Sequence, residues 1–264
     1  MPPIRIGLSL SGGGARGIAH IGVLKALKEH QLEPSAVAGS SAGAIAGALF
    51  AAGLSIEKMM EFVKDSKVFR MINLGIPSGG LIKPTYIKKR LAAYIKEDRF
   101  EALKLPLYVA ITNLNTGQLQ IVNEGPLFDV VMASSSIPLL FQPVEINGYH
   151  YVDGGLLNNM PVTPLVKTTN FVIGVNVMPQ IEIDEKSLQN FTSIATRCLY
   201  LSIKANTIPS LPLCNVVIEP KEAQNFHIFQ LNKFEELIEI GYQATIKKIP
   251  EIKAGIELIM QKSV

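Results

Sequence analysis

The sequence predicts an α/β fold in which helices cover both faces of a central sheet. Short runs rich in Val, Ile and Leu alternate with segments of helical periodicity along the chain, which is the pattern of such folds. The 264 residues are 48% hydrophobic, enough to bury one large core. No internal repeat, low-complexity segment or linker divides the chain. We therefore expect a single domain over residues 1–264.

The first part of the chain reads as two strand–helix units. We expect a strand at 4–10, a helix at 17–30, a buried strand at 36–39 and a helix at 42–53. In the first helix the apolar residues Ile18, Ile21, Leu24 and Leu27 share one face. Gly53 can close the second helix, and Ser55 can cap a third helix at 56–69.

The remaining elements follow from turn and breaker residues. Residues 69–83 are too apolar for a solvent loop and too broken for a helix, so they form either a flap over a pocket or a buried connection. We expect two strands within 105–122 around a turn at 115–117, and a hairpin at 144–155 that turns at Asn147-Gly148. Further strands are expected at 171–178 and near 215–219. Helices are expected at 126–136, near 187–204 and near 233–248.

Composition excludes several functional classes. The net charge of +3 comes without a long basic run, so nucleic-acid binding is not expected, although a weak preference for anionic membrane surfaces is compatible with it. The basic clusters at 88–90 and 247–248 are typical of solvated helix faces. Cys198 and Cys214 have no disulfide or metal spacing and are expected as buried thiols. The start of the chain has no leader pattern, so a cytoplasmic location is expected.

One apolar segment could be mistaken for a membrane span. Residues 36–54 are uncharged and long enough to cross a bilayer. Their sequence instead predicts a strand, a turn and a short helix of small residues in series. We therefore expect no span here.

A glycine-rich loop, "GGGARG" at residues 12–17, follows the first strand. It fits the dinucleotide pattern GxGxxG, but the acidic residue that would hold the ribose is missing after the second strand. A P-loop also fails, because no Lys-Ser or Lys-Thr follows Gly17. Glycines at a helix start can still point N–H groups at an anion, either a phosphate or the oxyanion of an ester under attack. Arg16 could add charge or hold the loop. A tight turn without a ligand is the alternative.

The sequence "GSSAG" places Ser41 between Gly39 and Gly43, which is the G-x-S-x-G pattern of a nucleophile elbow. A buried strand before it and a helix after it are the context that the elbow requires. Ser40 should point elsewhere and hydrogen-bond within the turn. On its own the pattern is short and recurs by chance.

A nucleophilic serine needs a base, and two candidates exist. Ser41, Asp153 and His227 occur in the order of an α/β-hydrolase triad, but only two strands precede Ser41 and no turn motif surrounds His227. All four histidines are better read as structural. The alternative base is Asp153, at a strand end before Gly154 and Gly155, where an ordinary Asp-Gly turn is the competing interpretation.

Taken together, four ordered motifs resemble the patatin-like phospholipases, a family of lipid acyl hydrolases. The motifs are "SGGGARGIAHIGVL", "AGSSAG", "MASSSIPLLFQPV" and "YVDGGLLNNMPV", within residues 4–177. The bacterial branch, related to the catalytic domain of neuropathy target esterase, is most similar in size. The C-terminal third adds no motif. Ser136 is a small departure, since the family often has alanine there.

The resemblance implies a three-layer α/β/α sandwich with a mostly parallel sheet and a Ser-Asp dyad without histidine, metal or cofactor. Ser41 would be the nucleophile and Asp153 its base. The glycine loop would form the oxyanion hole and its support, with flanking glycines at the elbow and after the aspartate. By position these are Gly12, Gly13 and Gly14 for the hole, Arg16 and Gly17 for support, Gly39 and Gly43 for the elbow, and Gly154 and Gly155 for the Asp-Gly-Gly motif.

The expected function is therefore hydrolysis of carboxylic esters of phospholipids or related lipids through an acyl-enzyme, with peripheral membrane contact left open. Apolar residues of the 59–82 region, among them Met59, Met60, Phe62, Met71, Ile72 and Leu74, are expected to line or cover the acyl site. The alternative is a catalytically silent lipid-binding or regulatory protein on the same scaffold.

Overall fold

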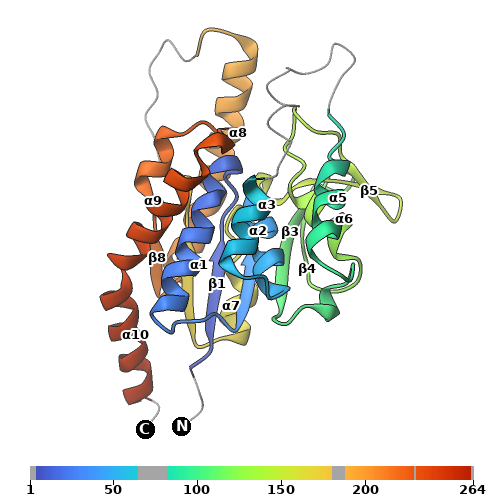
Figure 1. The fold of residues 1–264 in the computed structure, drawn as a ribbon. Coiled ribbons are helices and arrows are strands. Elements are labelled where there is room, and N and C mark those ends of the chain that lie inside the picture. Colours follow the sequence, from blue (N-terminus) through green and yellow to red (C-terminus); the bar gives the residue numbers. More distant parts are fainter. Residues whose placement is uncertain (1–3, 65–81, 180–187, 229, 263–264) are drawn as a thin grey trace.

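The computed structural model of the protein describes residues 4–64, 82–179, 188–228 and 230–262. The described residues form an eight-stranded sheet with strand order β5-β6-β3-β2-β1-β7-β8, and β4 pairs with β3 beside this path. Helices lie on both faces of the sheet (Figure 1). This arrangement confirms the predicted α/β sandwich with a mostly parallel sheet.

Five neighbouring parallel strands form the larger part of the sheet, with β8 at its edge. They are β1 (Ile6–Leu10), β2 (Ala36–Gly39), β3 (Leu107–Asn113), β7 (Phe171–Val175) and β8 (Val216–Ile218). Every residue of β1, β2 and β7 is buried. Helices on both faces exclude water from these strands, which explains their continuous apolar sequence.

Three strands run antiparallel at one end of the sheet: β4 (Gln118–Val122), β5 (Val144–Ile146) and β6 (Tyr149–Asp153). Val109 of β3 pairs with Gly39 of β2, and Ile111, two residues further on, pairs with Asp153 of β6. At both positions the other edge of β3 is paired with β4. The strands β2 and β6 therefore share one edge of β3, and β6 pairs with the part of it that follows the end of β2. The last residue of β6 therefore meets the carboxyl end of β2.

The larger core lies under the helices of one face. These are α1 (Ala19–Glu29), α2 (Ala42–Ala51), α3 (Ile56–Lys64), α5 (Thr85–Tyr94), α6 (Leu127–Ser134), α9 (Phe234–Ile246) and α10 (Ile249–Lys262). A smaller core, which includes Met160 and Leu165, packs under α7 (Thr163–Thr168) on the other face. In Figure 1, α8 (Phe191–Thr207) extends above the carboxyl ends of the parallel strands.

Turn and cap predictions agree with the structure where residues are described. Gly53 has φ 81° after α2, and Asn147 and Gly148 both have positive φ, as a tight hairpin turn requires. The Ser55 hydroxyl accepts from Lys58 N at 3.3 Å. Residues 36–54 form β2 and α2, as expected, and no helix of the described ranges is long and apolar enough to cross a membrane.

Other expectations need correction. The predicted helix at 17–30 begins earlier, as a 3-10 turn over Gly14–Ile18 that leads into α1. The helix predicted to reach residue 69 is described only to Lys64, since 65–81 lie outside the described residues. The sequence reading missed α7 and α10. Cys198, in α8, is exposed and Cys214 is half-buried, so neither is the fully buried thiol that was expected.

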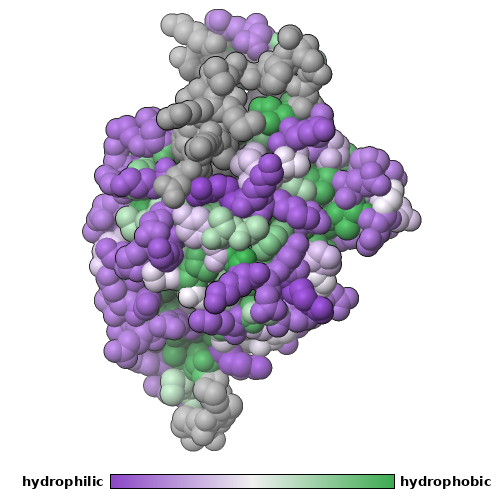
Figure 2. Space-filling view, turned by 45° about the vertical axis from the view of Figure 1, so that its right-hand side comes forward, coloured by the Kyte–Doolittle hydropathy of each residue, from purple (hydrophilic) through white to green (hydrophobic). Residues whose placement is uncertain are grey.

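The surface is mixed in character. Figure 2 shows that hydrophilic residues dominate the face in view, and hydrophobic residues reach that surface only in small groups between them. This distribution is normal for a folded domain, in which scattered exposed apolar residues need no partner.

Candidate active site

Ser41 lies at the turn between β2 and α2, where the chain passes from strand to helix. Its backbone has φ 54° and ψ −124°, a conformation that residues other than glycine rarely adopt. The flanking glycines make this turn possible through close backbone approach. A Cβ on Gly43 would lie 2.1 Å from Leu10 O, and one on Gly39 would lie 2.5 Å from Gly43 O. The structure therefore has the strand–turn–helix geometry of a nucleophile elbow.

Asp153 faces Ser41 directly. The Ser41 hydroxyl donates to Asp153 Oδ2 at 2.5 Å, and Asp153 Oδ1 accepts from Gly155 N at 2.7 Å. This contact follows from the register of β6, which ends where β2 ends. Gly154 lets the chain turn beside β3, since a Cβ there would lie 2.1 Å from Ala110 O. Asp153 is thus buried in a turn that its own hydrogen bond to Gly155 N stabilises.

The environment of Asp153 holds its carboxyl group near a useful pKa. Burial raises the pKa of Asp153 to about 7, while the hydrogen bonds from Ser41 and Gly155 lower it and offset part of that rise. A carboxylate with this pKa can accept a proton near neutral pH and return it in a later step.

The glycine loop lies across the elbow from Asp153. Gly12 N donates to Asn159 O at 3.0 Å, so this N–H group already has an acceptor. Among the described residues, neither Gly13 N nor Gly14 N has one. Gly14 has φ 57°, and a Cβ there would lie 2.4 Å from Ile228 O. Two backbone donors at the start of a helix are thus available beside Ser41.

Arg16 holds the loop from the C-terminal third of the chain. Its Nε donates to Phe226 O at 2.9 Å, and a second guanidinium nitrogen donates to Gln224 O at 3.2 Å. Ala15 N donates to Ile228 O at 2.6 Å in the same segment. Gly17 packs against the start of α2, where a Cβ would lie 2.4 Å from that of Ala42. The loop is therefore fixed on both sides.

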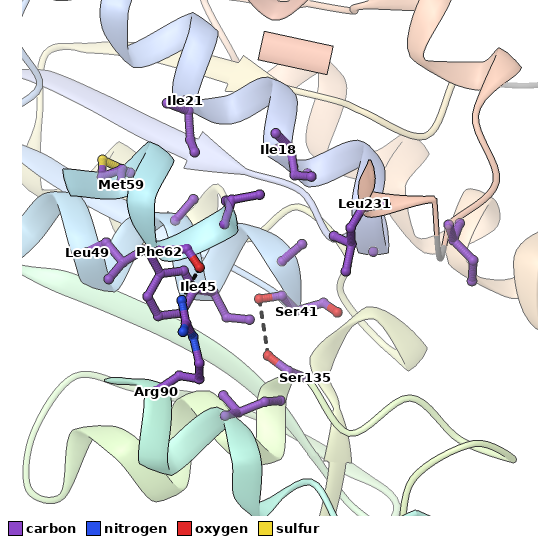
Figure 3. Close-up of a pocket in the computed structure, with 18 of the residues that line it drawn as sticks. Ile18, Ile21, Ser41, Ile45, Leu49, Met59, Phe62, Arg90, Ser135 and Leu231 are labelled. Atoms are coloured by element: carbon purple, nitrogen blue, oxygen red, sulfur yellow. Dashed lines mark hydrogen bonds between the residues drawn. The ribbon is translucent and has the colours of Figure 1, made fainter. Parts of the chain in front are cut away.

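Serines at the end of α6 support the elbow, a role that the sequence reading missed. Ser41 N donates to Ser134 Oγ at 2.9 Å, and Ser134 Oγ donates to Ala110 O at 2.7 Å. Ser135 Oγ lies 3.4 Å from Ser41 O (Figure 3). Ser136 donates its hydroxyl to Met132 O and its carbonyl accepts from Asp153 N, so the departure at this position leaves the dyad geometry intact. The sequence feature that indicates this supporting role is the run of three serines in the motif "MASSS".

The other polar candidates lie away from the reacting atoms. His20 is buried, its Nε2 lies 2.8 Å from Ser11 O, and burial lowers its pKa to about 4, so the ring is neutral. His227 lines neither of the pockets that reach Ser41. Ser40 was expected to hydrogen-bond within the turn, but its hydroxyl is buried without a partner in the described part of the chain.

A large apolar pocket of about 150 Å³ opens at Ser41. Figure 3 shows Leu49 and Met59 together at one end of the pocket, and Ser41 further along it toward Leu231. Leu49 lies eight positions after Ser41, which corresponds to a rise of about 12 Å along α2. The four residues of α2 that line the pocket recur with helical spacing: Ala42, Ile45, Ala46 and Leu49.

Residues outside α2 complete the lining of this pocket. The expectation that apolar residues of the 59–82 region line the acyl site is confirmed in part. Met59 and Phe62 line it and Met60 does not, while Met71, Ile72 and Leu74 lie outside the described residues. Arg90 also lines the pocket, with its guanidinium 4.7 Å from the centre of the Phe62 ring. The cluster at 88–90 is therefore not simply a solvated helix face.

Residues 8–166 match the family described as patatin-like phospholipase. The chain belongs to the patatin-like phospholipase family. An uncharacterised NTE family protein of Mycobacterium bovis is 33% identical over 61% of the chain and 45% of its own length. Patatin-like phospholipase domain-containing protein 7 of Rattus norvegicus is 26% identical over 90% of the chain and 20% of its own length. The chain thus spans less than half the length of these relatives.

A solved structure supports the fold of this family member. Human GIVD cytosolic phospholipase A2, in complex with methyl gamma-linolenyl fluorophosphonate, aligns with a TM-score of 0.54 at 11% identity, covering 98% of this chain and 60% of that chain. At this identity the likeness concerns the fold alone. It confirms the predicted α/β fold.

Proposed function

We propose that the protein is a lipid acyl hydrolase that cleaves carboxylic esters of phospholipids or related lipids through a Ser41–Asp153 dyad. The observation that carries this proposal is the 2.5 Å hydrogen bond from the Ser41 hydroxyl to the buried Asp153 carboxylate. It occurs at a strained elbow that opens into an apolar pocket. Membership in the patatin-like phospholipase family supports the same substrate class.

The first chemical step is acylation. Asp153 accepts the Ser41 proton while Oγ attacks the ester carbonyl carbon. The resulting oxyanion accepts hydrogen bonds from Gly13 N and Gly14 N, which have no other acceptor among the described residues. Asp153 then gives its proton to the alcohol that leaves, and the acyl group stays on Ser41.

The large pocket is the natural site for the acyl chain. It is almost entirely apolar, it begins at the nucleophile, and it follows α2 inward. Burial of each methylene contributes about 0.8 kcal/mol, so a long chain gains several kcal/mol in this pocket. The polar part of the lipid then remains on the other side of Ser41.

The alternative of a silent binding protein is disfavoured by the cost of the site. A non-glycine residue in the conformation of Ser41 costs about 1–3 kcal/mol, and a buried carboxyl group with a raised pKa is a further cost at neutral pH. A protein that only binds lipid requires neither feature.

Turnover of a short p-nitrophenyl ester by the wild-type protein and by Ser41→Ala tests the proposal. We expect the variant to lose about three to six orders of magnitude in kcat. A fluorophosphonate probe should label the wild-type protein at Ser41 only. His227→Ala is the matched control and should keep most activity. Activity that persists in folded Ser41→Ala, or is abolished in folded His227→Ala, would contradict the dyad. Product mass spectrometry on a lipid panel then identifies the substrate.

A further inference from the structure

A second, smaller pocket also reaches Ser41 and borders the acyl pocket at Gly14, Ile137 and Ile228. Its volume is about 30 Å³, and it lies between the glycine loop, the Asp153 turn and the inner face of α8. Its polar side chains are those of Ser41, Asp153, Asn159 and Tyr200. A cavity of 10–15 Å³ suffices for one water molecule when two or more polar groups surround it. The small pocket is therefore suited to water and too small for an acyl chain.

Asn159 is the unexplained polar group of this pocket. Only 1% of the residue is exposed, and its amide nitrogen has no hydrogen-bond partner within the described residues. Its backbone is fixed on both sides, since its carbonyl accepts from Gly12 N at 3.0 Å and its N–H donates to Asn206 Oδ1 at 2.8 Å. An unpaired buried amide costs about 1–3 kcal/mol, which indicates an additional partner such as water.

The Asn159 side chain faces the same small volume as the catalytic carboxylate. A Cβ built on Gly155 would lie 2.9 Å from Asn159 Oδ1 and 3.0 Å from Asp153 Oδ1. These short distances show that Asn159 Oδ1 and Asp153 Oδ1 both lie close to Gly155, and both side chains line the small pocket. A water molecule in the small pocket can contact an amide, which donates and accepts, and a carboxylate, which accepts.

We propose that Asn159 positions the water molecule that hydrolyses the acyl-enzyme. The inference rests on the proposed Ser41–Asp153 function and adds the group that serves its second step. The alcohol leaves on the side of Asp153, because Asp153 protonates it there, and water takes the vacated place. Asp153 then accepts one proton of the water, and the water oxygen forms a bond to the acyl carbon. The bond from that carbon to Ser41 Oγ breaks, Oγ regains the proton from Asp153, and a carboxylic acid is released.

This role predicts a specific kinetic change in Asn159→Ala and Asn159→Leu. Acylation does not use Asn159, so kcat/KM should stay within about twofold of the wild-type value. Deacylation should slow by about ten- to hundredfold, the effect of one lost hydrogen bond to a charged or reacting group. Because deacylation then limits turnover, kcat and KM should fall together. A p-nitrophenyl ester should give a burst of product, and intact mass spectrometry should show the acylated chain.

Rescue by a second nucleophile separates positioning from structural damage. Hydroxylamine attacks an acyl-enzyme without an oriented water molecule, so it should restore turnover in the Asn159 variants and have little effect on the wild-type protein. Asn158→Ala changes the neighbouring asparagine, which does not line the pocket, and should behave as the wild-type protein does. Asn159→Ser provides a smaller change if the leucine variant does not fold, as judged by its unfolding transition.

The outcomes are distinct. A fall in kcat/KM without a burst, an acylated chain or hydroxylamine rescue would show that Asn159 acts in acylation or only in folding, and would overturn the inference. Failure of the wild-type protein to form any acyl-enzyme or to react with a fluorophosphonate would instead refute the proposed function itself.

Discussion

Removal of the Asp153 charge tests the site through stability, independently of any substrate. Burial raises the pKa of Asp153 from 3.8 to about 7. Between these two values the folded protein holds a proton that the unfolded chain has already released. The free energy of unfolding therefore falls as pH rises through this window, and it levels off above the folded pKa. In Asp153→Asn the group does not titrate, so this contribution disappears.

The size of the effect follows from the two pKa values. With 3.8 for the unfolded chain and about 7 for the folded protein, the cost of ionising Asp153 grows between pH 5 and pH 8 by about 2 pK units. At 1.36 kcal/mol per unit this corresponds to about 3 kcal/mol. The wild-type protein should thus lose about 3 kcal/mol relative to Asp153→Asn over this range, and the variant should be relatively more stable at pH 8 than at pH 5.

Urea unfolding of both proteins at several pH values measures this difference, because effects of all other groups cancel when the two curves are subtracted. In Ser41→Ala the midpoint of the change should move to higher pH, since the hydroxyl hydrogen bond lowers the pKa of Asp153 in the wild-type protein. Parallel stability curves from pH 5 to pH 8 would refute the reasoning. In activity, kcat/KM should rise with pH through a value near 7 and then remain constant, as expected for a base that must be ionised.

Two further substitutions test the pocket geometry. Gly13→Val should lower kcat about a hundred- to a thousandfold or more, because a Cβ there would lie 2.6 Å from Val177 Cγ2 and would displace a proposed oxyanion donor. A raised KM with unchanged kcat would instead indicate that the glycine loop serves in binding. Ala46→Leu should block the acyl pocket between Ser41 and Leu49. Across a series of esters of increasing chain length, kcat/KM should fall by about tenfold or more for long chains and stay unchanged for acetate. An equal loss for short and long chains would contradict the assignment of this pocket to the acyl chain.

The sequence could predict those parts of the site that depend on local turn chemistry. Gly39 and Gly43 predict the elbow because a side chain at either position would collide with nearby backbone. The Asp-Gly-Gly turn is equally local, since Gly154 passes against β3 and Gly155 N binds the aspartate side chain. Strand–helix alternation was sufficient for the fold class, because buried parallel strands need helices on both faces.

Contacts between distant segments could not be predicted in this way. Arg16 and the carbonyl groups of Phe226 and Gln224 are separated by more than two hundred residues, and the acceptors are backbone atoms that leave no trace in the residue types. The residue types of the C-terminal third therefore do not indicate that this part of the chain holds the glycine loop. Likewise, the pairing of Ile111 with Asp153 depends on strand register, which short strands specify only through their packing.

The arrangement of two unlike pockets around Ser41 explains how one carboxylate can serve both halves of the proposed reaction. The apolar pocket holds the acyl chain on one side, so the acyl carbon stays in place after the alcohol departs. Asp153 lines only the small pocket, where the alcohol leaves and water enters. A base with a pKa near the working pH can both give the proton to the alcohol and take one from the water. Histidine is then unnecessary, because burial of the aspartate gives it the proton affinity that an imidazole would otherwise provide.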